Sequence, residues 1–156
     1  MSVFSEHRLL TRRGPVKNLL KACHAGRLVG GLSVSLRALP DEVVGALTHA
    51  MGGEARRFKV LDVRVGTPMV MEVMHDQVHE KWEVENVEGL VHNLNDLFRG
   101  APDVKLTAVL GEWEDMLQVW CVSREALAAL LDARLLDEAR NLSALVAIRE
   151  GSAEPR

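Results

Sequence analysis

The stretch from Val104 to Val122 reads VKLTAVLGEWEDMLQVWCV, and it decides which fold class the sequence predicts. Residues 104–110 and 116–122 are two nearly continuous apolar runs, a pattern typical of buried strands. The five residues between them, Gly-Glu-Trp-Glu-Asp, predict a β-hairpin with a five-residue connection. Such strands need cover on both faces, so we expect helices of the same chain or a second subunit to pack on them.

Helical and alternating periodicities extend this pattern toward both ends of the chain. Apolar residues at helical spacing, with proline or a capping side chain in front, predict helices that begin near Pro15, Pro40, Asn86 and Ser123. Besides the hairpin, alternation or short apolar runs predict strands at residues 32–36, 58–65, 69–74, 78–85 and 142–148. The predicted order of elements is therefore αβαβββαββαβ.

Helices and short strands mixed in this order predict the α+β class, with helices packed on an antiparallel or mixed β-sheet. From Val78 onward the order βαββαβ is that of a ferredoxin-like unit. From Pro40 to about Leu136 the order αβββαββα resembles the secretion-chaperone and YbjN-like fold. That resemblance implies a protein that dimerises and binds other proteins. Element order does not encode strand pairing, so both arrangements remain open at this point.

A length of 156 residues, with 47% apolar and 26% charged residues, indicates an ordinary globular chain. We expect one α+β domain over residues 1–150, with a basic N-terminal helix region at 1–27 and a disordered tail at 151–156. No apolar run approaches the roughly 18 residues of a membrane span, and no apolar leader follows Met1. The sequence therefore predicts a cytoplasmic protein without a membrane partner.

The net charge of −3 hides an uneven distribution. Residues 1–64 contain eleven Lys or Arg against five Asp or Glu, a balance of +6. Residues 65–156 contain eight against seventeen, a balance of −9. A basic arm beside an acidic body can contact phosphate, an acidic partner or another copy of the chain. Alternatively, the two halves neutralise each other within one fold.

The first predicted helix concentrates basic side chains on one side. At 100° per residue, Arg13, Lys17, Lys21 and His24 fall within about 80° of one another, beside the apolar stripe. Such a row can contact successive phosphates or an acidic partner surface. The alternative is the solvated charged face of an ordinary amphipathic helix.

Trp113 lies in the acidic connection of the predicted hairpin. A large apolar ring at an exposed tip is a credible anchor for a binding partner. The connection can also fold back so that the ring covers the edge of the core.

The pattern His75-Asp76-Gln77-Val78-His79 is a candidate metal site, because two histidines four residues apart share one face of a helix. It resembles the H-E-x-x-H motif of zinc proteases, but Asp76 stands in place of the catalytic glutamate. The strand pattern around these residues instead favours a solvated polar turn.

Other catalytic signatures are missing from the sequence. It contains no G-x-S-x-G elbow, phosphate-binding glycine loop or dinucleotide fingerprint, and we expect no cofactor. Of the two cysteines, Cys121 lies in a strongly apolar strand pattern and is expected to be an inert buried thiol. Cys23 lies on the inner stripe of the first predicted helix, and neither cysteine has a C-x-x-C partner. These features favour a non-catalytic interaction module, homodimeric, that docks a protein partner through the basic helix. The alternatives are a nucleic-acid-associated accessory protein and a metal-dependent enzyme that uses His75 and His79.

Overall fold

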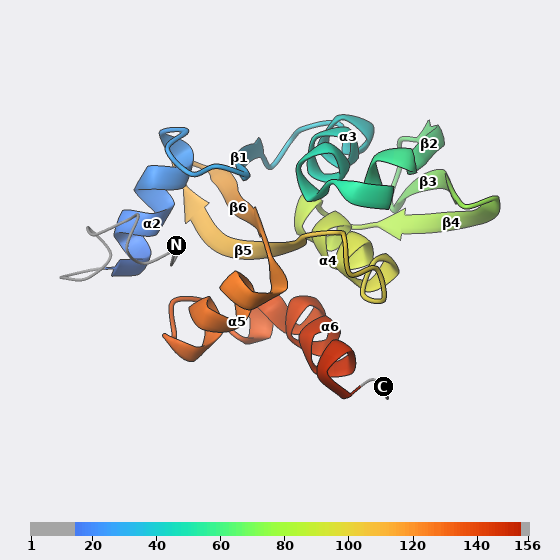
Figure 1. Cartoon of the computed structure of the whole chain (residues 1–156). Helices are drawn as coiled ribbons and strands as arrows, with labels where there is room; N and C mark the ends of the chain where they lie inside the picture. Colours follow the sequence, from blue (N-terminus) through green and yellow to red (C-terminus); the bar gives the residue numbers. More distant parts are fainter. Residues whose placement is uncertain (1–14, 154–156) are drawn as a thin grey trace.

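The computed structural model describes residues 15–153 and confirms the α+β class (Figure 1). Its α-helices are α2 (Pro15–His24), α3 (Pro40–Met51), α4 (Val87–Leu97), α5 (Arg124–Asp132) and α6 (Leu142–Ala153). Its strands are β1 (Gly31–Ser35), β2 (Lys59–Arg64), β3 (Met69–His75), β4 (Val78–Val84), β5 (Leu106–Trp113) and β6 (Met116–Val122). Two short 3₁₀ helices, η2 (Gly53–Arg57) and η3 (Ala139–Asn141), precede β2 and α6.

The first sheet has the strand order β1-β6-β5 and separates two hydrophobic cores. Alternate side chains of β6 face opposite cores: Leu117, Val119 and Cys121 belong to one, and Trp120 and Val122 to the other. Helices α3 and α4 cover the first face, while α2, α5 and α6 cover the second (Figure 1). The apolar strands of the hairpin are thus covered on both faces by helices of their own chain.

The second sheet has the strand order β2-β3-β4, and it packs on α3 and α4 from the other side (Figure 1). Met71 and Val73 of β3 are buried in the core shared with these helices. Lys59 and Lys81 pair with the neighbours of these two residues, so they lie on the opposite, open face. Both sheets are antiparallel throughout.

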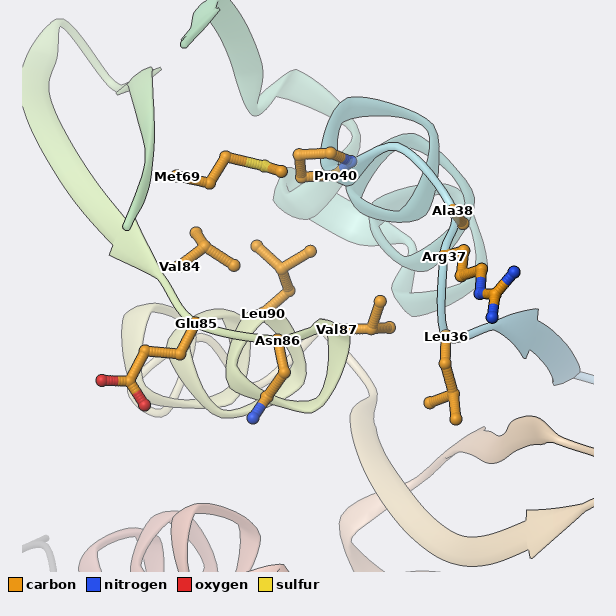
Figure 2. A pocket seen from close by; sticks show the side chains of 10 residues that line it. All are labelled: Leu36, Arg37, Ala38, Pro40, Met69, Val84, Glu85, Asn86, Val87 and Leu90. Atoms are coloured by element: carbon orange, nitrogen blue, oxygen red, sulfur yellow. The ribbon is translucent and has the colours of Figure 1, made fainter. Parts of the chain in front are cut away.

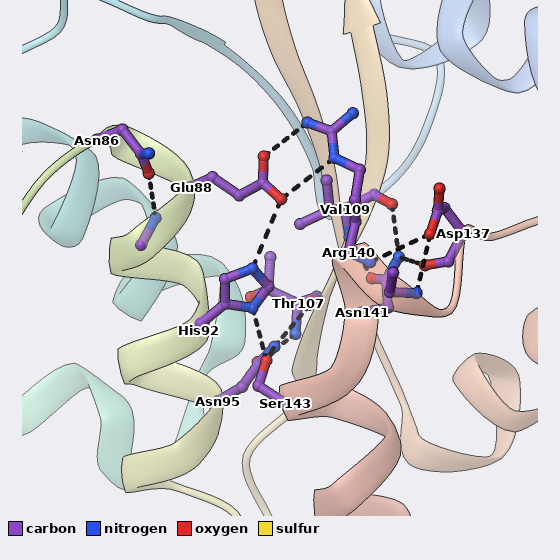
Figure 3. A network of polar contacts seen from close by, with 12 residues as sticks. Asn86, Glu88, His92, Asn95, Thr107, Val109, Asp137, Arg140, Asn141 and Ser143 are labelled. Atoms are coloured by element: carbon purple, nitrogen blue, oxygen red, sulfur yellow. Dashed lines mark hydrogen bonds and ion pairs between the residues drawn. The ribbon is translucent and has the colours of Figure 1, made fainter.

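The free edge of β5 is closed by two asparagine side chains (Figure 3). The Asn95 amide accepts a hydrogen bond from Thr107 N and donates one to Thr107 O, both at 2.8 Å. Asn141 repeats this arrangement on Val109, at 2.7 Å to the nitrogen and 3.0 Å to the oxygen. The two amides therefore occupy the hydrogen-bonding positions that another strand would use.

Four of the five described α-helices, α2 to α5, begin where the sequence predicts. Pro40 occupies the first turn of α3, and the side chains of Asn86 and Ser123 accept the capping hydrogen bonds of α4 and α5. Within residues 15–153, every helix is too short to cross a bilayer, since the longest have 12 residues against the roughly 20 that a span requires.

The predicted strand at 142–148 is wrong, because these residues begin α6. Ala144 and Ala147 are fully buried, while Leu142 and Val146 are exposed, which is helical rather than alternating spacing. Without this strand the ferredoxin-like order βαββαβ is not formed, and the predicted order αβαβββαββαβ fails at its last element. The described elements from α3 to α5 do follow the order αβββαββα.

The connection of the central hairpin is shorter than predicted. Strands β5 and β6 run to Trp113 and from Met116, and only Glu114 and Asp115 form the turn. Their φ angles of 54° and 59° are those of a two-residue turn with left-handed backbone, which matches the twist of the strands. A bulge between Val109 and Gly111 absorbs the change in register.

The structure describes only part of the sequence at each end of the predicted domain. The basic region at 1–27 is described from Pro15 onward, so Arg13 lies outside the described residues. At the other end α6 continues to Ala153, into the range predicted as a disordered tail from residue 151. Residues 154–156 lie outside the described part.

Candidate functional site

The basic side of α2 lies against Trp113, at the end of β5. The Nζ atoms of Lys17 and Lys21 are 5.9 Å and 5.6 Å from the centre of the Trp113 ring, which are cation–π distances. Leu20 of the same helix packs on Gly111, where an added Cβ would lie 3.2 Å from Leu20 Cδ2. The half-buried Trp113 ring therefore folds back onto α2 rather than standing free at the hairpin tip.

The two lysines keep their charges available for a partner. Among the described residues, neither Lys17 nor Lys21 has a carboxylate within 4.0 Å, although both side chains are exposed. Their contact with Trp113 orders the ammonium groups without neutralising them. An ordered, unpaired cation loses less entropy when it binds a carboxylate than a freely moving one does.

His24, the third predicted residue that the structure describes on this helix, joins a small polar cluster beside Trp113. His24 Nδ1 and Ser33 Oγ share a hydrogen bond of 3.0 Å. The fully buried Gln118 donates from Nε2 to Ser33 Oγ at 2.8 Å and to Trp113 O at 3.3 Å. Gln118 Nε2 also lies 3.4 Å from His24 Nδ1, so Gln118 connects β6 to both the hairpin end and α2.

Ser33 and Gln118 were not predicted as part of this surface. Gln118 is the polar residue within the apolar run 116–122, and a buried amide in such a strand usually has a specific hydrogen-bonding role. A polar residue within an apolar strand was therefore the feature of the sequence that could have identified Gln118. Ser33 carries no comparable signal, because it lies at an ordinary outward position of an alternating strand.

An open groove of about 260 Å³ borders the same helix. Lys21 and Arg27 supply its charged groups, and the remaining lining is small or polar: Asn18, Ala22 and Ala25. Lys21 thus belongs both to the Trp113 contact and to this groove. Arg27 extends the row of cations beyond the end of the helix.

The predicted histidine pair is not brought together. In the β3–β4 hairpin His75 pairs with Val78 and His79 pairs with Met74. Paired residues share a face and consecutive residues alternate, so His75 and His79 lie on opposite faces of the second sheet. His75 points inward, and its nearest potential partners in metal binding are Glu54 and Asp76.

A polar network joins α4 to η3 and α6 (Figure 3). Glu88 accepts hydrogen bonds from Arg140 Nη2 at 2.6 Å and Nε at 3.2 Å. The Arg140 hydrogen bond lowers the pKa of the Glu88 carboxyl below its ordinary value, and the same contact raises the pKa of Arg140. Arg140 also lies 3.6 Å from Glu112, so it connects α4 to β5.

The same network contains an acid, a histidine and a serine in succession. His92 Nε2 lies 3.6 Å from Glu88, and its Nδ1 shares a 2.9 Å hydrogen bond with Ser143 Oγ. Asn95 also donates to Ser143 Oγ, at 3.2 Å, which reduces the nucleophilicity of that oxygen. Because the Glu88 carboxylate is already engaged by Arg140, we interpret the network as a clamp between α4 and α6 rather than a catalytic triad.

A groove of about 160 Å³ lies between the start of α3 and the start of α4 (Figure 2). Its lining is mostly apolar: Leu36, Ala38, Pro40, Met69, Val84, Val87 and Leu90. Arg37, Glu85 and Asn86 supply its polar side chains, and the Asn86 oxygen is engaged in capping α4. This lining offers no nucleophile and no set of metal ligands.

Both cysteines are buried free thiols, as the sequence predicts. Cys23 Sγ approaches the carbonyl oxygens of Leu32 and Val119, and Cys121 Sγ contacts Thr107 Oγ1. Burial raises the pKa of each thiol to about 11. Neither thiol is therefore suited to nucleophilic chemistry near neutral pH.

Comparison of the chain with models of protein families, with curated proteins and with solved structures gave no match. The geometry of the described residues is therefore the basis for assigning a function.

Proposed function

We propose that this protein is a non-catalytic interaction module that binds an acidic segment of a protein partner. The docking surface is the α2–Trp113 face, formed by Lys17, Lys21, His24, Arg27 and Trp113. The observation that carries the proposal is that Lys17 and Lys21 share the Trp113 ring and have no carboxylate partner among the described residues.

Charge and shape together favour an acidic protein segment over a nucleic acid. A single-strand binding platform needs aromatic faces that are free to stack with bases. Both lysine ammonium groups lie over the Trp113 ring, so this ring is engaged by cations. A row of ordered ammonium groups beside an open groove instead suits carboxylates that enter one after another from an extended chain.

The test is affinity capture from the native host with three forms of the full chain. Lys17→Glu/Lys21→Glu reverses the charges of the proposed face. Lys59→Glu/Lys81→Glu makes the same change on the open face of the second sheet and serves as the matched control. We expect a protein that wild type and control retain and that the α2 variant loses by roughly 10-fold or more.

Two outcomes would contradict the proposal. Recovery of the same proteins by all three forms would show that α2 is not the docking surface. Loss of the captured material after nuclease treatment, with affinity that falls steeply with salt, would show that the ligand is nucleic acid.

Self-association is a related proposal with a separate test. The predicted homodimer was based on strands that need cover, and helices of the same chain supply that cover. A second copy still offers an acidic partner, because residues 65–156 carry the negative balance. Light scattering after size exclusion should then give twice the chain mass of 17.2 kDa, and a monomer at tens of micromolar would exclude it.

We also infer a cytoplasmic location. Both cysteines are free thiols in the described structure, and reducing compartments are where free cysteines predominate.

A further inference from the structure

Glu54, His75 and Asp76 converge where η2 meets the turn between β3 and β4. One potential ligand atom from each residue lies within 4.8 Å of the other two. We infer that these three side chains form a binding site for a divalent transition-metal ion, with Zn²⁺ as the ion that fits best. The site lies away from the α2–Trp113 face and does not depend on the function proposed for it.

The three potential ligand atoms need to move only a little closer together to bind one zinc ion. In a tetrahedral zinc site with bonds of about 2.0–2.2 Å, neighbouring ligand atoms are about 3.4 Å apart. The separation of up to 4.8 Å must therefore shrink by roughly 1.4 Å at most. Asp76 and Glu54, whose side chains are 57% and 29% exposed, can supply this movement by rotation about their side-chain bonds.

His75 is the fixed member of the site. Its side chain is only 14% exposed, and the edge of its ring meets Phe98 at a centroid distance of 4.8 Å. Packing of this kind holds the imidazole in one orientation before any ion arrives. A preorganised first ligand reduces the entropy lost on metal binding.

The hydrogen bonding of His75 is also incomplete. Nε2 lies 3.4 Å from Asp76 Oδ2, whereas the buried Nδ1 has no partner among the described residues. The Nε2 lone pair is free only in the tautomer with the proton on Nδ1, since the other tautomer donates from Nε2 to Asp76. In the first tautomer the Nε2 lone pair and the carboxylate oxygen repel each other. A cation between Nε2 and the carboxylates removes this repulsion.

The donor set determines which ion fits. One imidazole nitrogen and two carboxylate oxygens match the nitrogen and oxygen ligands of zinc sites, in which water completes the tetrahedron. An imidazole ligand disfavours Mg²⁺ and Ca²⁺, which prefer oxygen donors. Arg57 pairs with Glu54 at 3.5 Å, but its side chain is 68% exposed, so it can move aside at small cost.

The experiment is calorimetric titration of Zn²⁺ into the full chain, purified without an affinity tag. Glu54→Gln and Asp76→Asn each remove one ligand charge. Asn tolerates the φ of 48° at position 76, so the turn is preserved. Both substitutions avoid the largely buried ring of His75, whose replacement would also disturb its packing on Phe98.

Two control substitutions match these changes outside the site. His79→Gln removes the histidine on the opposite face of the same hairpin. Asp115→Asn makes the same change as Asp76→Asn in the two-residue turn between β5 and β6, where φ is 59°.

We expect one equivalent of Zn²⁺ to bind the wild-type chain and both controls. Affinity should fall at least about tenfold in Glu54→Gln and in Asp76→Asn. Co²⁺ in place of Zn²⁺ should show the visible bands of nitrogen and oxygen ligation without thiolate charge-transfer absorption. The inference is overturned if no saturable binding occurs, if both site variants bind as tightly as wild type, or if the Co²⁺ spectrum shows thiolate ligation.

Discussion

Lys21 Nζ lies 5.6 Å from the centre of the Trp113 ring and connects α2 to the tip of the β5–β6 hairpin. Lys17, one helical turn earlier, lies 5.9 Å from the same ring. The two lysines of α2 and Trp113 of β5, which are far apart in the chain, thereby form one surface. The relationship makes the candidate docking surface part of the fold, because the side chains that would bind a partner also hold the helix on the sheet.

Removing both ammonium groups should measurably weaken that attachment. Lys17→Met/Lys21→Met keeps the length of the side chains but abolishes two exposed cation–π contacts, each worth about 0.5–1 kcal/mol. We expect the free energy of unfolding in urea to fall by about 1 kcal/mol. Lys59→Met/Lys81→Met on the second sheet should have no such effect, and equal losses in both variants would contradict the assignment.

The Glu88–Arg140 pair predicts a specific dependence of stability on pH. Arg140 lowers the pKa of Glu88 in the folded chain below the ordinary 4.5. Its stabilising contribution is therefore complete above pH 4.5 and is lost as the pH falls through the lower folded-state value. Glu88→Gln should cost on the order of 1 kcal/mol at pH 7 and less at pH 3, measured by urea unfolding.

Glu125→Gln is the matched control for this effect. Glu125 and Glu88 both lie in the first turn of a helix, so both substitutions remove one favourable interaction with the helix dipole. Of the two, only Glu88 has an arginine partner among the described residues. Glu88→Gln should therefore reduce the loss of unfolding free energy between pH 7 and pH 3 more than Glu125→Gln does. Identical profiles for the two variants would count against the pair.

The asparagine side chains on the edge of β5 should be expensive to remove. Asn95→Ala deprives both Thr107 N and Thr107 O of their partner in a buried position, for an expected loss of about 2–4 kcal/mol. Asn93→Ala on the same helix should cost less than about 1 kcal/mol, because no hydrogen bond of that side chain is found among the described residues. Chemical denaturation of the two variants measures both losses in the free energy of unfolding.

The thiols should resist modification while the chain is folded. With pKa values raised to about 11 by burial, Cys23 and Cys121 hold few thiolates at pH 8. We expect iodoacetamide to label neither cysteine in native buffer and both in denaturant, as counted by mass spectrometry. A Ser35→Cys variant, with its cysteine at an exposed position, should be labelled once in native buffer and so verifies the reagent.

Local structure was predictable where one rule dominates. Pro40, Asn86 and Ser123 mark the starts of helices by known capping chemistry, and the apolar runs at 104–110 and 116–122 contain the paired strands. The failure at 142–148 has a specific cause. Leu, Val and Ile crowd this stretch as they would a buried strand, but the residues that are fully buried are Ala144 and Ala147, and Ile148 is only partly buried against the core. Small buried residues at helical spacing give a weak apolar pattern.

The candidate sites were predictable only in part. Lys17, Lys21 and Trp113 stand out individually, but their convergence depends on how α2 packs on β5, which no local pattern encodes. The histidine spacing at 75 and 79 was informative only for a helix, and the strand register separates the two rings. Glu54 had no signal, because a 3₁₀ turn some twenty residues earlier in the chain brings it to His75.

The alternation of side chains along β6 has a consequence for how the protein unfolds. Leu117 and Val119 belong to one core, while Trp120 and Val122 belong to the other. Loss of β6 from the sheet would expose both hydrophobic cores at once. Neither core can therefore unfold while the other core stays folded. Heating should therefore produce a single cooperative transition, with the same midpoint whether it is followed by tryptophan fluorescence or by circular dichroism of the backbone.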